Sequence, residues 1–178
     1  MVKQHISYIR QLLLLLAVIV QASCLNDSHT DDDRTGKVNV GDAVPNFILT
    51  SADGETVSSS SLSGKAYILS FFDTGCPDCQ KEFPVLQRIY ETYQSVPMFN
   101  VPRSQSLDEV KQYWSKDGLT MPVYMPQDKD LYYRFATSGI PRIYIVDRQG
   151  IVQAVFTDSP LADYDTIDAI LQKYQNNE

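Results

Sequence analysis

The sequence predicts an α/β fold in which a mixed central sheet carries helices on both of its faces. Three observations lead to this prediction. An apolar run at 66–72 precedes a helical pattern, strands and helices then alternate, and the last two apolar runs flank a tight turn at 147–150. Strand–helix alternation is typical of parallel strands packed between helices, whereas a hairpin adds an antiparallel pair. The 178 residues suit one domain with an appendage.

The individual elements follow in order from residue 47. A short strand at 47–50 ends in an Asp-Gly turn, and the nearly all-apolar strand at 66–72 is expected to be covered on both faces. The next helix, at 80–94, contains Pro84, which predicts a kink. The later elements are a strand at 96–101, helices at 107–116 and 128–136, strands at 142–146 and 151–156, and a last helix ending near residue 174.

The composition excludes several classes of function. The net charge is −7 and no stripe of basic residues is present, so a nucleic-acid partner is not expected. The two histidines, His5 and His29, precede the globular region, which therefore has no imidazole for nucleophilic catalysis or for metal and haem ligation. Three cysteines alone cannot complete a four-ligand zinc site. Neither a metal nor another cofactor is expected.

The pair Cys76 and Cys79 is the strongest functional signal in the chain. The two thiols lie between the apolar strand and the helical pattern, which places Cys76 at a helix N-terminus. Free backbone N–H groups and the helix dipole stabilise a thiolate there. Such a thiolate can attack a disulfide, and the second thiol can then resolve the mixed disulfide. The pair therefore predicts a dithiol–disulfide oxidoreductase, with a stable structural disulfide as the alternative.

Residues 1–23 have the features of an export signal. Two basic residues precede an unbroken apolar run of nine residues at 12–20, which is too short for the about 20 residues that span a bilayer. Small residues follow at 22–23, and Cys24 comes directly after them. The segment 21–24 resembles a bacterial lipoprotein signal, although glutamine replaces its usual leucine. This resemblance implies lipidation of Cys24 and a membrane anchor; secretion with a free Cys24 is the alternative.

Residues 24–39 are expected to form a tether between the anchor and a domain at 40–178. The stretch at 26–34 is acidic and has no apolar side chain to bury. The expected location is the bacterial cell envelope, with the domain facing the periplasm. An acidic stretch near a lipidated cysteine also resembles the surface-export signals of some Bacteroidota lipoproteins, so the cell surface is the alternative.

Four segments carry a resemblance to one family. Residues 40–47 resemble an AhpC/TSA-like opening segment, and residues 71–79 stand where the family has its redox strand and CxxC pair. Residues 82–84 continue the redox helix, and residues 138–141 resemble a cis-proline loop. Together they resemble the thioredoxin-like family, in its exported branch of membrane-tethered thiol-disulfide reductases, which includes the cytochrome-c-maturation thioredoxins. The resemblance implies a three-layer sandwich.

The resemblance also implies roles for particular residues. Cys76 is the exposed nucleophile and Cys79 the buried resolving thiol, and together they form the redox disulfide. Pro141 is the cis-proline, and Ile140 presents its backbone to a substrate peptide as an added strand. Glu82 is a candidate proton acceptor for Cys79. An ordinary loop proline and a solvated glutamate are the alternatives. The implied partners are disulfide-bearing exported proteins and a membrane thiol electron donor.

Two departures from the family pattern affect the expected chemistry. Gly75 replaces the usual tryptophan, which opens the site. Asp73 and Asp78 lie close to Cys76, and because negative charge disfavours a nearby thiolate, a reductase is expected and not a strong oxidase. A peroxiredoxin-type peroxidase is the first alternative, but it needs threonine where Asp73 stands. A non-catalytic binding lipoprotein on the same fold is the second.

Overall fold

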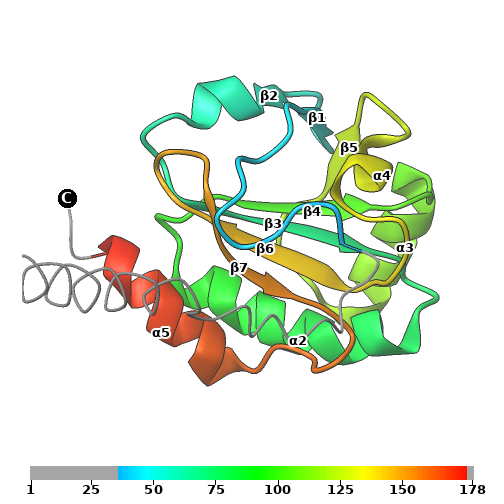
Figure 1. Ribbon diagram of the computed structural model, residues 1–178. Coiled ribbons are helices and arrows are strands. Elements are labelled where there is room, and N and C mark those ends of the chain that lie inside the picture. Colours follow the sequence, from blue (N-terminus) through cyan, green and yellow to red (C-terminus); the bar gives the residue numbers. More distant parts are fainter. Residues whose placement is uncertain (1–35, 176–178) are drawn as a thin grey trace, which may run out of the picture. The chain divides into compact units, whose positions relative to one another are not determined.

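The computed structural model describes residues 36–175, which contain a four-stranded sheet and a three-stranded sheet (Figure 1). The predicted signal segment and Cys24 lie outside the described residues. The elements, in chain order, are β1 (Ile48–Ser51), β2 (Thr56–Ser58), the 3-10 helix η1 (Ser59–Leu62), β3 (Tyr67–Phe72), α2 (Pro77–Thr92), β4 (Met98–Pro102), α3 (Leu107–Asp117), β5 (Tyr124–Pro126), α4 (Leu131–Phe135), β6 (Arg142–Val146), β7 (Val152–Phe156) and α5 (Tyr164–Gln175).

The larger sheet is mixed, as the sequence predicts. Its strand order is β4-β3-β6-β7, with β3 parallel to β4 and antiparallel to β6, and β7 returns antiparallel to β6. All six residues of β3 are buried. Strands buried on both faces read as continuous apolar runs, which explains why the sequence marks this strand so clearly.

Adjacent residues of β3 show how both faces of the sheet are covered, because successive side chains point to opposite faces. On one face, the Phe72 ring lies 5.4 Å from Phe83 of α2 and 5.0 Å from Trp114 of α3. On the other face, the Phe71 ring lies 5.0 Å from Phe135 of α4. The last helix, α5, runs beside α2 (Figure 1). The predicted α/β sandwich with helices on both faces is therefore confirmed.

The smaller sheet contains two strands that the sequence did not reveal. Its order is β2-β1-β5, and both pairings are antiparallel. Strands β2 and β5 each have only three residues, and β5 ends in Pro126. Three residues are too few to show the alternation that marks a strand, and proline is depleted in strands. Long-range pairing with β1 forms these strands, and it leaves no local signal.

The folded part begins before residue 40, which corrects the predicted boundary of the tether. The backbone N–H groups of Lys37 and Val38 both donate to the carbonyl of Phe135, at 2.8 and 3.1 Å. The Val38 side chain is only 4% exposed and belongs to the core. These backbone hydrogen bonds and the buried Val38 side chain dock this segment beside α4. Among residues 36–175, none of the helices has the length and apolarity that a membrane span requires.

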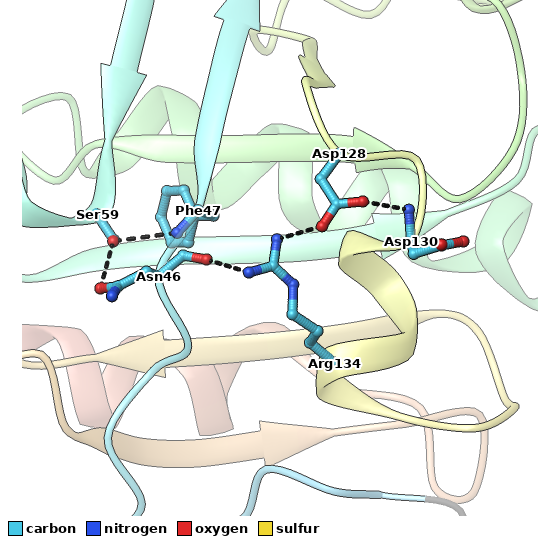
Figure 2. Close-up of polar contacts among 6 residues, drawn as sticks. All are labelled: Asn46, Phe47, Ser59, Asp128, Asp130 and Arg134. Carbon is cyan, nitrogen blue, oxygen red and sulfur yellow. Dashed lines mark hydrogen bonds and ion pairs between the residues drawn. The ribbon is translucent and has the colours of Figure 1, made fainter.

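Arg134 of α4 connects this helix to the small sheet. Its guanidinium donates to the backbone carbonyl of Asn46 and to the Asp128 carboxylate, both at 2.7 Å (Figure 2). The Ser59 hydroxyl accepts from the N–H of Phe47 at 3.1 Å on the same side. These residues border a cavity of about 520 Å³. The contacts hold the start of β1 and the start of α4 in one fixed arrangement.

Candidate active site: the Cys76–Cys79 dithiol

Cys76 lies where strand β3 gives way to helix α2. It is the N-cap residue of α2, with φ −84° and ψ 121°, and Pro77 occupies the first helical position. Proline suits that position because its missing N–H would have no partner within the helix. The N–H of Cys76 donates to the carbonyl of Asp73 at 3.1 Å, and the N–H of Gln80 donates to the carbonyl of Cys76 at 3.0 Å. The thiol thus stands at a helix N-terminus, where the sequence predicts it.

The two thiols differ in their access to solvent. Cys76 is partly exposed, whereas Cys79 is fully buried. Burial raises the pKa of the Cys79 thiol far above its ordinary value, and the neighbouring Cys76 shifts it in the same direction. An incoming disulfide can therefore reach only Cys76, and Cys79 must lose a proton before it can act.

The loop before β6 lies against the exposed thiol. The Cys76 Sγ lies 3.5 Å from the backbone carbonyl oxygen of Ile140. The Ile140–Pro141 peptide is cis, as the resemblance implies. Gly139 has φ 87°, a left-handed conformation that glycine adopts without steric cost. The structure thus brings the predicted nucleophile and the predicted substrate-facing backbone into direct contact.

Glu82 lies one helical turn after Cys79 on α2, and residues three apart share a helix face. Its side chain is only 1% exposed, and neither carboxylate oxygen accepts a hydrogen bond of full geometry from the described residues. Burial raises its pKa to about 7, the charge of Asp163 acts in the same direction, and the backbone N–H of Ala162 opposes the shift. The alternative prediction, that Glu82 is a solvated surface residue, is therefore wrong. This carboxyl group can change its charge near neutral pH.

Gln105 is a site residue that the sequence did not reveal. Its side chain accepts from the N–H of Thr74 at 2.7 Å and donates to the Thr74 hydroxyl at 2.7 Å. Gln80 donates to the Thr74 carbonyl at 2.8 Å. Gln105 belongs to no motif, but it follows β4, and parallel strands bring their C-terminal ends to the same sheet edge. These three bonds fix the backbone two residues before Cys76.

The two acids near Cys76, Asp73 and Asp78, each form a polar contact with another residue. The Asp73 carboxylate accepts from the N–H of Gly75 at 2.8 Å. Asp78 forms an ion pair with Lys81 at 2.8 Å, and both side chains are substantially exposed to solvent. Solvent and the lysine charge therefore reduce the influence of Asp78 on the thiol.

Taken together, the geometry supports thiol–disulfide exchange. An accessible thiol, a buried thiol and a carboxyl group that titrates near neutral pH lie on successive turns of α2. A backbone edge lies beside the accessible thiol. Within residues 36–175, no three Cys, His, Asp or Glu side chains gather in a way that could hold a metal ion.

Sequence comparison identifies the family. Residues 40–155 match the AhpC/TSA family. The thiol-disulfide oxidoreductase ResA of Bacillus subtilis (strain 168) is 28% identical over 133 residues, which are 71% of this chain and 74% of that protein. The protein of the same name from Geobacillus kaustophilus (strain HTA426) is 27% identical over 122 residues, which are 67% of this chain and 70% of that one.

Solved structures show the same relationship. A thioredoxin family thiol:disulfide interchange protein from Chlorobium tepidum TLS has a TM-score of 0.63 at 30% identity, covering 75% of this chain and 95% of that one. A thio-disulfide isomerase from Thermus thermophilus has a TM-score of 0.63 at 26% identity, covering 76% and 96%. These likenesses confirm the thioredoxin-like fold. The chain therefore belongs to the AhpC/TSA family, and within it the chain is similar to thioredoxin-like thiol-disulfide oxidoreductases of the ResA type.

Proposed function

We propose that this protein is an exported, lipid-anchored oxidoreductase that reduces disulfides in exported proteins. One observation carries the proposal: a partly exposed thiol at the N-terminus of α2 lies 3.5 Å from the carbonyl of Ile140, with a fully buried thiol one turn further along. The ResA-type relatives are named thiol-disulfide oxidoreductases, which agrees with this chemistry.

The proposed reaction transfers two electrons to the substrate. The Cys76 thiolate attacks one sulfur of a substrate disulfide, and the other substrate sulfur leaves as a thiolate. The Cys79 thiolate then attacks the Cys76 sulfur and releases the second substrate thiolate. The substrate gains two thiols, and the protein ends with a Cys76–Cys79 disulfide. An external dithiol, for which a membrane thiol carrier is proposed, must return the pair to the reduced form.

Glu82 is proposed to take the proton from Cys79 in the second step. Burial disfavours the Cys79 thiolate, so resolution needs a proton acceptor that is itself shielded from solvent. Glu82 meets this requirement because it is buried and its pKa of about 7 matches a base that works near neutral pH.

The backbone beside Pro141 is proposed to hold the substrate chain. The carbonyl of Ile140 faces the nucleophile, and an extended peptide can pair with such an edge as an added strand. This pairing would hold a substrate disulfide next to Cys76 whatever side chains surround it.

The peroxiredoxin-type alternative is not favoured. Asp73, and not threonine, lies three residues before Cys76, and the matching relatives are named oxidoreductases. A non-catalytic binding protein is the remaining alternative, and the cysteine variants below distinguish it.

Substitution of each cysteine should affect a different step. Cys76→Ser should reduce insulin disulfides no faster than buffer, because the accessible nucleophile is gone. Cys79→Ser should instead accumulate a mixed disulfide through Cys76, visible as a thiol-sensitive mass increase. Unchanged insulin reduction by Cys76→Ser would support the non-catalytic alternative.

Glu82→Gln should lower the rate of resolution by at least about tenfold and abolish its rise with pH near 7. Rapid-mixing kinetics of mixed-disulfide decay across pH 5 to 9 measure this rate.

The stability of the fold gives an independent readout of the Glu82 pKa. Because the folded-state pKa of Glu82 exceeds the unfolded value, the unfolding free energy should fall between about pH 4.5 and about pH 7. Urea titrations should show this fall in the wild type and lose it in Glu82→Gln; equal slopes would contradict the assigned burial.

The reduction potential should be that of a reductant. Asp73, with a smaller contribution from the exposed and lysine-paired Asp78, leads us to expect a value nearer to about −270 mV than to about −120 mV. Alkylation and mass shift in graded thiol buffers give the value. A result near the higher potential would make the protein an oxidant and overturn the proposed direction of electron flow.

Lipidation of Cys24 can be tested directly. Wild-type protein should fractionate with membranes and incorporate labelled palmitate, whereas Cys24→Ala should do neither, since the acyl chains provide the anchor. Cys76→Ser is the matched control, because it removes a thiol and keeps Cys24. Soluble, unlabelled wild-type protein would show that it is secreted without an anchor.

A further inference from the structure

A groove next to the loop that leads to Cys76 contains side chains that the proposed reaction does not use. Its volume is about 440 Å³, and it lies between the loop after β4 and the segment from β5 to α4. The lining combines two cations, Arg103 and Lys129, with an exposed aromatic ring, Tyr133, and the apolar surfaces of Met125 and Pro126.

One wall of the groove is bonded to the end of β3 and to the redox loop, which comprises residues 73–76. The N–H of Arg103 donates to the carbonyl of Phe72, the last residue of β3, at 2.8 Å. Gln105, in the same wall, exchanges two hydrogen bonds of 2.7 Å with Thr74. The wall therefore continues directly into the backbone that positions Cys76.

The other wall is linked to the cis-proline loop through Tyr132, the buried neighbour of the lining residue Tyr133. The Tyr132 hydroxyl donates to the carbonyl of Gly139 at 2.7 Å, and Gly139 precedes Ile140, whose carbonyl faces the nucleophile. The Tyr133 ring lies 5.3 Å from the Tyr132 ring, and the Arg103 guanidinium lies 5.7 Å from that same ring. The buried Tyr132 thus contacts the cis-proline loop through its hydroxyl and the groove residues Arg103 and Tyr133 through its ring.

The groove differs in charge from the rest of the molecule. The chain has a net charge of −7, yet the residues lining the groove include no acid. Neither Arg103 nor Lys129 forms an ion pair with any residue of the described part of the chain. Asp128 and Asp130 flank Lys129 but lie outside the lining, and Asp128 is already paired with Arg134 (Figure 2).

We propose that this groove binds an acidic segment of the substrate polypeptide adjacent to its disulfide, an inference that rests on the proposed function. Carboxylates of that segment pair with Arg103 and Lys129, and its apolar side chains pack on Tyr133 and Met125. Charge-assisted hydrogen bonds are stronger than neutral ones, and charge complementarity acts mainly on selectivity and on the rate of encounter. The groove therefore selects which disulfides reach Cys76, whereas the Ile140 edge accepts any extended chain.

The test uses two synthetic peptides, each containing one disulfide and differing only in their flanks, which carry Asp and Glu in one and Asn and Gln in the other. Pre-reduced protein is mixed with each peptide in a single turnover, so no recycling reductant is needed. The wild type should reduce the acidic peptide roughly tenfold faster. This preference should shrink toward one as ionic strength rises from about 0.01 M to about 1 M.

Substitutions in the groove test whether Arg103 and Lys129 cause the preference for the acidic peptide. Lys129→Glu and Arg103→Gln should each reduce the ratio of the two rates, and the double variant should abolish or reverse it. Lys65→Glu is the matched control, because this exposed lysine precedes β3 at the end opposite to the redox loop, and it should leave the ratio unchanged. Partial unfolding of a variant would lower both rates together and cannot reverse their ratio.

The outcomes separate the two proposals. Reduction of neither peptide by the wild type would overturn the proposed function. Equal reduction of both peptides would overturn the groove inference and leave the oxidoreductase in place. A preference for the acidic peptide that survives the double variant would likewise overturn the groove as its source.

Discussion

The pairing of the buried strand β3 with its two neighbours sets the position of every reactive group. Phe71 lies opposite Arg142 of β6, and Phe72 lies opposite Pro102 of β4. The end of β3, the start of β6 and the end of β4 therefore meet at one edge. Cys76 follows the first, the cis-proline precedes the second, and Gln105 follows the third. A one-residue slip in either pairing would turn the strand's side chains to the wrong faces and separate the thiol from its substrate edge.

Burial then gives two chemically identical side chains different tasks. Cys76 has access to solvent and to the dipole of α2, whereas Cys79 is enclosed by the core. A sealed thiol is protected from outside disulfides, but it also needs a base that shares its environment. A carboxyl group in the open would be ionised at neutral pH and would be a weak acceptor. The low polarity around Glu82 raises its basicity, so the same core that encloses Cys79 also raises the basicity of the proposed proton acceptor.

Local sequence patterns made the centre of this site, the CxxC pair with its strand and helix, predictable. The surrounding parts could not be predicted in this way. The CxxC spacing, the apolar run of β3 and the helical period of α2 are all written in contiguous residues. The burial of Glu82 agrees with its spacing to Cys79, but the sequence alone left both its burial and its role open. Strands β2 and β5, by contrast, exist only through pairing with β1. Gln105 and the docked segment at Val38 likewise depend on distant partners, which no local pattern encodes.

The aromatic packing on one face of the sheet has an optical consequence. The chain has a single tryptophan, Trp114, and its indole lies against Phe72 and Phe83. Phe83 follows Cys79 by one helical turn, and Phe72 ends the strand that leads to Cys76. The tryptophan fluorescence of the protein therefore originates against the strand and the helix that flank Cys76. The molecule therefore carries its own spectroscopic reporter on the helix of the proposed redox pair.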